Sequence, residues 1–559
     1  MKKLGQELRD QLEEVVVALN DGWRVLRHRG PSKIIFWFIA MLIGVAAGTA
    51  ALLFRSAISH LQTLFYGSDD IALASAAANL PWYWVLILPV LGGLVVGQIL
   101  HRFTQDGRVR SVADVIEGAA LRDGQVETRE GIASLFASLI TLCTGGSTGR
   151  EGPVVHFAGV ISTWVSRWMH ADGITGRDLL GCAVAAAVSA SFNAPIAGAI
   201  FALEVVLRHF AVHAFAPIVI ASVAGTVVNR LKYGDVTEFV LAEEGALVFY
   251  IELPAFLLLG ILCGLVAVAL MRGIFWAEST ANYVQNHTKM PRWLRPAVAG
   301  AMLGVIAIGF PHIIGVGYET TSRALTGELL LHEALVFAVI KSIAVGVTVA
   351  GRMGGGVFSP SLMVGALTGL GFGIVATGIF PNVSGSETLY ALAGMGAVAA
   401  AVLGAPISTT LIVFELTGDW QTGLAVMTAV SLSTAISSRL VDRSFFLTQL
   451  ERRGEHVAPG PQAYLLAMFR VSSVMRPLSH PRAPSETALQ EAMEAGLAVD
   501  RGATLERIMP LFEQSERPFL PVVIADPQGE PHLVGAVFHV DALKAYARAL
   551  AATAAEEHS

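Results

Sequence analysis

The chain has 559 residues, of which 54% are hydrophobic and only 15% are charged, and its mean hydropathy is +0.60. A soluble domain usually carries about 25% charged residues, so this composition excludes an ordinary soluble protein and indicates lipid as the main solvent. The net charge is −6 and no basic face is evident, which excludes a nucleic-acid partner. Three cysteines lie in apolar runs at unrelated spacings and predict neither a disulfide nor a metal site.

The first 32 residues are charged and amphipathic, and they lack the apolar core of a signal peptide. We expect a cytoplasmic helix over residues 1–32. Basic residues from Lys2 to Lys33 flank the first apolar run, and the positive-inside rule therefore places this end in the cytoplasm. The sequence thus predicts a multi-pass protein of a bacterial inner (plasma) membrane with both termini cytoplasmic.

Apolar runs recur from Ile34–Phe54 to Leu424–Ile436 and predict a transmembrane domain over residues 33–455. Shorter, glycine-rich runs lie between them, for example Ser361–Ile379 and Tyr390–Val402. A helix needs about 20 residues to cross ~30 Å of hydrocarbon, and several runs are shorter. Short, interrupted segments in both halves of a membrane protein indicate broken helices around a site near the middle of the bilayer.

The stretch from Gly145 to Pro153 places a glutamate and an arginine inside this apolar region. Charge at membrane depth is costly and usually marks a functional site. Four glycines precede Pro153, so we expect irregular backbone up to about Glu151 and a helix from there onward. The start of such a helix presents free N–H groups and the positive end of the helix dipole. The stretch therefore predicts an anion-binding site.

Two sets of motifs recur in the same order along the chain. Asn193–Ile196 is followed by Glu204, and Gly404–Ile407 is followed at the same spacing by Glu415. A glycine-rich turn that ends in proline precedes each copy: Gly149–Pro153 and Gly356–Pro360. These copies predict two repeats, and inversion is the common arrangement in transporters. Their approximate bounds are residues 34–240 and 245–440.

The composition changes after the basic residues between Arg439 and Arg453. A proline-rich linker, expected over residues 456–470, leads to a soluble α/β pattern over residues 471–559. The Val471–Met475 segment is interpreted as the remnant of a first strand. The other expected elements are a helix at Thr504–Gln514, strands at Pro518–Ala525 and His532–Phe538, and a helix at Val540–Ala551.

Four signatures, in this order, resemble those of the CLC family of chloride channels and proton-coupled chloride exchangers. They are Gly149–Pro153, Phe192–Pro195, Gly356–Pro360 and Phe414–Gly418. The resemblance extends from about Ile34 to Gly454 and implies an all-α polytopic membrane protein with two inverted repeats of broken and tilted helices. It also implies a homodimer without a cofactor. Each subunit would have one pathway for chloride or a similar anion, with protons as the second substrate of the exchangers.

The tail resembles a cystathionine-β-synthase-type (CBS) module. Leu520–Val523 matches the first strand of that module, and Leu533–Val537 with Asp541 and Leu543 matches its second strand and helix. Such modules normally work in pairs, and the sequence contains one convincing unit. The resemblance therefore predicts a small α/β CBS-like cytoplasmic domain without an assigned nucleotide site.

The family's pattern assigns the anion contacts to backbone N–H groups at two helix starts. In this chain they are the backbone around Gly149, Arg150 and Glu151, and the backbone of Val357 and Phe358. Such amides stabilise a dehydrated halide without a full cation that would trap it. Glu151 matches the family's gating glutamate, whose carboxylate competes with the anion for one place and takes up a proton. A structural ion pair with Arg150 is the alternative role for Glu151.

Two further positions match the family's anion pathway but depart from its pattern. Ser111 matches the serine whose hydroxyl contacts the central anion, although Arg110 and Val112–Asp114 replace the usual glycines, isoleucine and proline. A plain helix N-cap is the alternative role for Ser111. Phe446 takes the place of the inner-gate tyrosine, by its register to Arg452–Gly454. Its ring has no hydroxyl to donate to an anion.

The proton path is less complete than the anion path. Val205 stands where many family exchangers have a second, proton-relaying glutamate, and valine carries no proton. The adjacent Glu204 is a candidate substitute, although the repeat-related Glu415 favours a structural role for both. Val205 and Phe446 favour a passive channel, whereas the intact Glu151 favours proton-coupled exchange, which is our main expectation.

Two other classes of function remain open. An intramembrane serine hydrolase would use Ser147 with His156, but the sequence shows no orienting acid beside them. A histidine packed on a helix face is the simpler interpretation of His156. A membrane sensor would use the tail as its working part and would leave Glu151 unexplained. We therefore expect a transporter, not an enzyme.

Overall fold

The computed structural model describes residues 33–557 apart from a few gaps. The gaps are residues 172, 211, 236–238, 240, 242–248, 382, 385, 456, 458–465, 467, 468, 516 and 526–530. The helix expected over residues 1–32 and most of the linker expected over residues 456–470 therefore lie outside the described residues.

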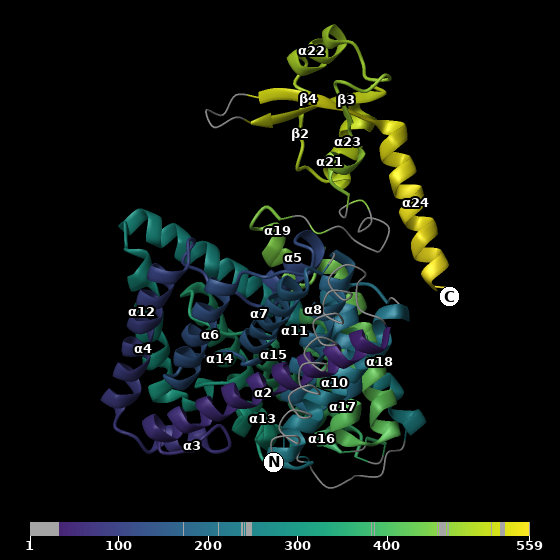
Figure 1. Ribbon diagram of the computed structural model, residues 1–559. Coiled ribbons are helices and arrows are strands. Elements are labelled where there is room, and N and C mark those ends of the chain that lie inside the picture. The colour runs from purple at the N-terminus through teal and green to yellow at the C-terminus, as the bar shows by residue number, and fades with distance from the viewer. Residues whose placement is uncertain are drawn as a thin grey trace, which may run out of the picture.

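Helices of very different length form one bundle between Lys33 and Glu451 (Figure 1). The first half contains α2 (Lys33–Tyr66), α3 (Leu73–Ala78), α4 (Trp82–Phe103), α5 (Val112–Leu121), α6 (Thr128–Cys143), α7 (Glu151–Met169), α8 (Gly173–Phe192), α9 (Pro195–Phe201), the π-helical turn η1 (Ala202–Leu207) and α10 (Val212–Tyr233). The second half contains α11 (Phe249–Thr288), η2 (Arg292–Leu294), α12 (Arg295–Gly309), η3 (Pro311–Ile313), α13 (Tyr318–Leu325), α14 (Leu331–Ala350), α15 (Phe358–Ile379), α16 (Glu387–Leu403), α17 (Pro406–Thr417), α18 (Trp420–Leu440) and α19 (Phe445–Glu451).

The distribution of polar and apolar side chains matches a bundle surrounded by hydrocarbon. Within the described part of the chain, seven helices are long and apolar enough to cross a membrane. Large apolar side chains such as Val305 and Val339 are exposed, whereas polar side chains such as Ser189 and Lys341 are buried. A soluble fold places these two kinds of side chain the other way round. The shorter apolar helices α9, α16 and α17 confirm the expectation of broken segments.

The two halves break their helices in the same way. Asn193 follows the last residue of α8, and Gly404 follows the last residue of α16. Both residues adopt a left-handed backbone (φ 56° and 70°). Pro195 and Pro406 then start α9 and α17. A left-handed residue ends a helix, and a proline at the first position starts the next one without losing a hydrogen bond. The repeated motifs of the sequence therefore mark equivalent helix breaks.

The two repeats also hold each other's helices by exchanging carboxylates. Glu204 of the first repeat accepts hydrogen bonds from the N–H groups of Ile407 (2.9 Å) and Ser408 (2.8 Å) at the start of α17. Glu415 of the second repeat accepts from the N–H groups of the two residues after Pro195 at the start of α9 (3.0 and 2.7 Å). This exchange has the two-fold symmetry of two related repeats, which the sequence predicted and which the resemblance to the family implies to be inverted. It satisfies N–H groups that a helix start leaves unpaired.

The tail forms a small α/β unit beyond the end of the bundle at which α5 and α19 lie (Figure 1). Its elements are α21 (Val471–Val474), β1 (Arg476–Pro477), α22 (Glu486–Glu494), β2 (Val499–Asp500), α23 (Leu505–Ser515), β3 (Phe519–Ala525), β4 (Pro531–Phe538) and α24 (His539–Glu557). The sheet order is β1-β4-β3-β2, with β2 parallel to β3 and the other pairs antiparallel. The two strands and two helices expected from Thr504 onward are confirmed.

One expectation for the tail is wrong. The Val471–Met475 segment forms the short helix α21 rather than a strand. The N–H groups of Val471 and Ser472 donate to the carbonyls of Ala503 and Arg501 (2.8 and 3.0 Å), and Val471 is buried in the core of the tail. Burial of this one side chain therefore overrides the strand preference of a valine-rich segment.

The exchanged carboxylates generate a prediction about stability. Glu415→Ala, and separately Glu204→Ala, should each lower the free energy of unfolding by about 2 kcal/mol, because a charged cap is lost and N–H groups are left unpaired. Thermal unfolding of the purified protein in detergent measures the effect. Glu451→Ala, which removes an outlying ion pair with Arg443 (3.8 Å), is the control and should change the melting temperature little. Equal melting temperatures for all variants would contradict a capping role.

Candidate functional site

The two glycine-rich turns meet inside the bundle. The Gly149 N–H donates to the Gly356 carbonyl (2.7 Å), and the Gly356 N–H donates back to the Gly149 carbonyl (2.8 Å), which makes an antiparallel bridge between the repeats. The hydroxyl of Thr148 donates to the same Gly356 carbonyl (2.9 Å). Helices α7 and α15 start just after these glycines. Their N-termini, with the positive ends of both helix dipoles, therefore converge on one place.

Small residues are required at this junction because the two turns touch. Gly355 has φ 131°, and a Cβ at this position would lie 2.0 Å from Oγ1 of Thr148. Pro153 and Pro360 each occupy the third position of their helices, where a backbone N–H has no partner within the helix. The expectation that the first helix begins at about Glu151 is confirmed.

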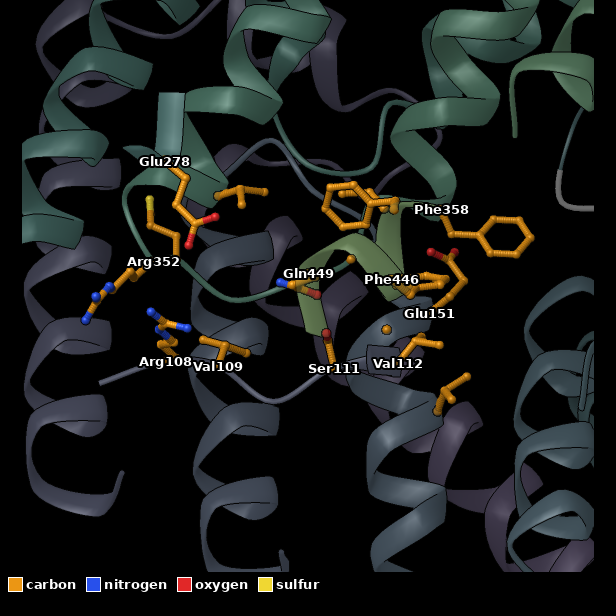
Figure 2. Close-up of a pocket in the computed structure, with 18 of the residues that line it drawn as sticks. Arg108, Val109, Ser111, Val112, Glu151, Glu278, Arg352, Phe358, Phe446 and Gln449 are labelled. Atoms are coloured by element: carbon orange, nitrogen blue, oxygen red, sulfur yellow. The ribbon is translucent and has the colours of Figure 1, made fainter. Parts of the chain in front are cut away.

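A cavity of about 300 Å³ lies in front of these helix starts. Five of the site residues expected from the sequence line it: Ser111, Glu151, Val357, Phe358 and Phe446. They come from four segments that are far apart in the chain. Figure 2 shows Glu151, Phe358 and Phe446 gathered at one end of the cavity, with Ser111 and Gln449 closer to its middle.

The side chain of Glu151 is buried, with 2% of its surface exposed. Its Oε1 accepts hydrogen bonds from the hydroxyls of Ser359 (2.5 Å) and Tyr318 (3.2 Å). Its Oε2 has no hydrogen-bond partner among the described residues. Sequence reasoning missed both hydroxyls. A polar residue inside the Gly356–Pro360 turn was a signal for Ser359, whereas nothing local marks Tyr318.

Two residues that were expected at the anion site, Gly149 and Arg150, have other roles in the structure. The N–H of Gly149 donates to Gly356, so it has no proton left to offer an anion, and we withdraw it as a ligand. The guanidinium of Arg150 lies over the ring of Tyr318, with 4.8 Å between Cζ and the ring centroid. Its charge therefore acts on the residue that hydrogen-bonds Glu151, and Arg150 is not among the residues that line the cavity.

Ser111 is the N-cap residue of α5 and also lines the cavity, so its two expected roles are compatible. The carboxylate of Asp114 accepts from the backbone N–H of Ser111 (2.7 Å), which fixes the loop in place of the family's glycines. Asp114 also forms ion pairs with Arg453 (2.8 Å) and Arg110 (3.6 Å). Its negative charge beside the pathway is therefore balanced by two cations.

A further ion-pair network supports this loop from outside the membrane-spanning segments. Burial alone would raise the pKa of Glu127, but a hydrogen bond from Arg122 and the charge of Arg110 lower the pKa to about 2. A carboxyl whose pKa is lowered by folding contributes stability above its unfolded pKa and loses it only as the pH falls toward the folded value. Glu127 therefore stays ionised above about pH 4, whereas burial raises the pKa of its neighbour Glu130.

Phe446 is buried and forms part of the cavity wall, and the neighbouring Phe445 stacks on Phe275 (5.0 Å between centroids). Gln449, one helical turn further along α19, lines the same cavity. Its side-chain oxygen has no hydrogen-bond partner among the described residues, and the two ends of an amide are exchanged by a simple flip. Gln449 therefore offers the N–H donors that Phe446 lacks. Sequence reasoning missed Gln449 because the family's pattern assigns this donor to the position of Phe446 alone.

Val205, at the usual relay position, and Glu204, its candidate substitute, do not line the cavity. Val205 is buried in the π-helical turn η1. Both carboxylate oxygens of Glu204 accept hydrogen bonds at the start of α17. Protonation of Glu204 would weaken those bonds, so the geometry favours the structural role that the repeat-related Glu415 had suggested.

Ser147 and His156 do not form a catalytic pair. The Ser147 hydroxyl and both ring nitrogens of His156 have no hydrogen-bond partner in the described part of the chain. The backbone N–H of Ser147 is held by Thr348 (3.1 Å), and the His156 ring packs against Gly131 on α6. A serine nucleophile requires a base within hydrogen-bond reach, which is missing here.

Arginines gather at the other end of the cavity. Figure 2 shows Arg108 and Arg352 there together with Glu278, and Arg452 also lines the cavity. Among the described residues, these three arginines have no carboxylate within ion-pair distance. Arg352 and Arg452 instead donate to backbone carbonyls (3.0 and 3.2 Å). This end of the cavity therefore attracts anions toward the helix starts.

The fold and the site define a class: a multi-pass membrane protein with a buried cavity between two opposed helix starts. The chain matches the voltage gated chloride channel family over residues 92–438. A protein of Ralstonia nicotianae with a name that describes it as ClcB-like is 31% identical over 395 residues, which are 70% of this chain and 91% of that protein. The chain therefore belongs to the CLC family of membrane proteins that transport anions.

Two solved structures share the fold. One, of a slow cyanobacterial Cl⁻/H⁺ antiporter, covers 76% of this chain and 98% of its own, with a TM-score of 0.67 at 20% identity. The other, of a eukaryotic CLC transporter, covers 93% of this chain and 98% of its own, with a TM-score of 0.65 at 18% identity. The second match extends beyond the helical bundle into the tail.

The arginines at the cavity mouth generate a prediction about anion capture. Arg108→Gln should lower anion flux several-fold at low ionic strength, because long-range attraction raises the local concentration of anions. The difference should shrink at high ionic strength, where the charge is screened within about 10 Å. Flux into liposomes at two concentrations of an impermeant salt measures it. Arg102→Gln, at the exposed end of α4, is the matched control, and a salt-independent loss in Arg108→Gln would contradict the electrostatic explanation.

Proposed function

We propose that the chain carries chloride, or a similar small inorganic anion, through the cavity in front of α7 and α15, and that Glu151 is the gate. The observation that carries this proposal is the position of Glu151. Its carboxylate is buried at the place where two helix N-termini converge, and it lines the same cavity as their first residues. A carboxylate and a halide are both stabilised by such helix starts, so they compete for it.

The anion is held by groups of two kinds along this cavity. At the inner end of the path, the backbone N–H groups of Val357 and Phe358 at the start of α15 act as donors without a full charge. Toward the arginine mouth, the Ser111 hydroxyl and the Gln449 amide are the side-chain donors. Phe446 then acts as a wall of the pathway and not as a ligand.

We infer proton-coupled exchange, with a passive anion channel as the second candidate. Exchange is supported by the intact Glu151, and a cyanobacterial Cl⁻/H⁺ antiporter shares the fold. The channel is supported by Val205 and by the use of Glu204 as a helix cap, because together they leave the usual relay position empty of a titratable group. Phe446 also favours a less tightly closed inner side.

We further infer a bacterial inner-membrane protein with both termini cytoplasmic, which acts as a homodimer and is not an enzyme. The basic residues Arg439 to Arg453 follow the last long helix, and the tail lies at the same end of the bundle, which fits the positive-inside rule (Figure 1). The neighbouring helices α9 and α17 each expose an isoleucine at their start, Ile196 (55%) and Ile407 (50%), and we take the surface around these two starts as one apolar face. That apolar face is our candidate for the contact between subunits, with one complete pathway in each.

The first test concerns the gate. Glu151→Gln should keep anion flux but lose its pH dependence and any proton coupling, because glutamine neither ionises nor carries a proton. Purified protein in liposomes under a chloride gradient, with internal pH followed by a dye, measures both quantities. Glu451→Gln, outside the cavity, is the control. Continued proton movement against a chloride gradient in Glu151→Gln would remove Glu151 from the proposal, and a wild-type reversal potential that ignores the pH gradient would establish the channel.

The second test concerns the side-chain donor Gln449 and the neighbouring wall residue Phe446. Gln449→Leu should raise the chloride concentration for half-maximal flux by about tenfold, which corresponds to one lost hydrogen bond to a charged group. Phe446→Tyr adds a hydroxyl to the cavity wall and should lower that concentration. Concentration dependence of flux in liposomes measures both changes. An unchanged concentration dependence in Gln449→Leu would exclude the amide as an anion ligand.

A further inference from the structure

The hydroxyls of Tyr318 and Ser359 contact the gating carboxylate in a way that neither the family resemblance nor the anion pathway requires. We propose that they form a resting site for the ionised Glu151 carboxylate, beside the helix starts and not on them. Glu151 can then leave the anion position without first taking up a proton. This inference rests on the proposed function, because it assigns a second position to the same gate.

The hydrogen bonds of Glu151 define the resting site. Both donors to Oε1 are side-chain hydroxyls, from Ser359 at 2.5 Å and from Tyr318 at 3.2 Å. Within the described part of the chain, no backbone N–H donates to this carboxylate. The amides at the start of α15 are therefore not used by Glu151 in this conformation, although Glu151 lies beside them.

The resting site is suited to a charged carboxylate more than to a neutral acid. Two O–H donors converge on one oxygen, and hydrogen bonds to an ionised acceptor are roughly twice as strong as those to a neutral one. The guanidinium of Arg150 lies over the Tyr318 ring (4.8 Å), where it adds a positive charge near the hydroxyl. Both features stabilise the ionised form of Glu151 away from the anion position.

Tyr318 is held firmly in this place. It is the first residue of α13 and follows Gly317, whose φ of 95° requires glycine. The buried ammonium of Lys341 donates to the carbonyls of Ile313 (3.1 Å) and Gly315 (3.0 Å) in the turn before it. The N–H of Gly315 donates in turn to the Gly146 carbonyl (3.1 Å). The turn that positions the second-repeat tyrosine is thus tied to the first-repeat loop that precedes Glu151.

Other charged groups lie around Glu151, and their effects can be separated from those of the hydroxyls. Arg150 and Lys341 are basic side chains that are kept in every variant below. His156 lies on the same helix but packs against α6, and Asp114 on the neighbouring α5 is paired with Arg453. The charged groups that line the cavity together with Glu151 are Arg108, Glu278, Arg352, Arg452 and Arg453.

The resting site changes how anion flux depends on pH. An ionised Glu151 can occupy the helix starts, where it blocks the anion, or the hydroxyls, where it does not. A protonated Glu151 is neutral, binds the helix starts weakly and leaves them open at low pH. With the hydroxyls present, flux therefore continues at high pH through the ionised, displaced carboxylate. Without them, the ionised carboxylate returns to the helix starts and blocks the anion.

The test uses Ser359→Ala and Tyr318→Phe in the full-length protein in liposomes. Each variant should keep its anion flux at about pH 5 and lose about tenfold at about pH 9 relative to wild type, the loss expected for one hydrogen bond to a carboxylate. Ser359→Thr keeps a hydroxyl and should restore the wild-type profile. Ser361→Ala is the matched control, because Ser361 lies on the same helix, is buried and donates to the Phe358 carbonyl (2.6 Å).

Three outcomes are possible, and each decides the proposal. A selective loss at high pH that disappears in a Glu151→Gln background supports the resting site. An unchanged pH profile, or an equal loss at both pH values, overturns it, because the hydroxyls then either do nothing or serve the fold alone. These results are distinct from failure of the proposed function, in which the wild-type protein itself moves no anion at any pH.

Discussion

Two backbone hydrogen bonds, exchanged between Gly149 and Gly356, hold the rest of the pathway in place. They bring together two helix starts that are more than 200 residues apart in the chain. A single helix start in water is a weak anion site, because solvent screens its partial charge. Two starts that converge inside the protein act together, because the protein around them screens their partial charges less than bulk solvent does. A glycine is needed at Gly355, next to this bridge, because any side chain there would collide with Thr148.

Three carboxylates lie at or beside helix starts in this fold, and they are held in two different ways. Glu204 and Glu415 each use both carboxylate oxygens as acceptors at the helix starts of the other repeat. Glu151 uses one oxygen, and only with hydroxyls. A carboxylate whose two oxygens both accept hydrogen bonds is held in place, whereas Glu151 keeps one oxygen without a partner among the described residues, which costs free energy where it lies. The duplicated helix starts thus have a fixed pair of caps at one place and, at the other, the acid that we propose as the gate.

Local sequence patterns predicted most of the architecture, because the motifs that break helices are short and chemically explicit. The glycine-rich turns, the Asn193–Ile196 and Gly404–Ile407 breaks and the start of α7 all follow from left-handed residues, prolines and apolar run lengths. Contacts between distant segments were not predictable in the same way. The partner of Glu204 lies about 200 residues away on α17, and only the repeat made a structural role plausible.

The site shows the same limit in more detail. Matching to the family's positions brought Ser111, Glu151 and Phe446 to one cavity, but it assigned an amide to Gly149 that the bridge to Gly356 already uses. It also missed Gln449, which replaces a donor from the next turn of the helix, and Tyr318, which reaches Glu151 from a segment without any motif. A position-by-position comparison does not detect a function that has moved to a neighbouring residue, whereas the cavity does.

The position of these residues bears on the difference between an exchanger and a channel. Val205 and Glu204 are absent from the cavity lining, while Glu278 and Glu151 lie on the same cavity. The cavity therefore extends from the arginines to Glu151, and in the proposed exchanger the protons that enter from that side would share it with the anion. Coupling in such an arrangement cannot come from two separate routes. In the proposed exchanger it depends on how often Glu151 leaves the helix starts without a proton, and the free energy of the Tyr318 and Ser359 hydrogen bonds sets that share.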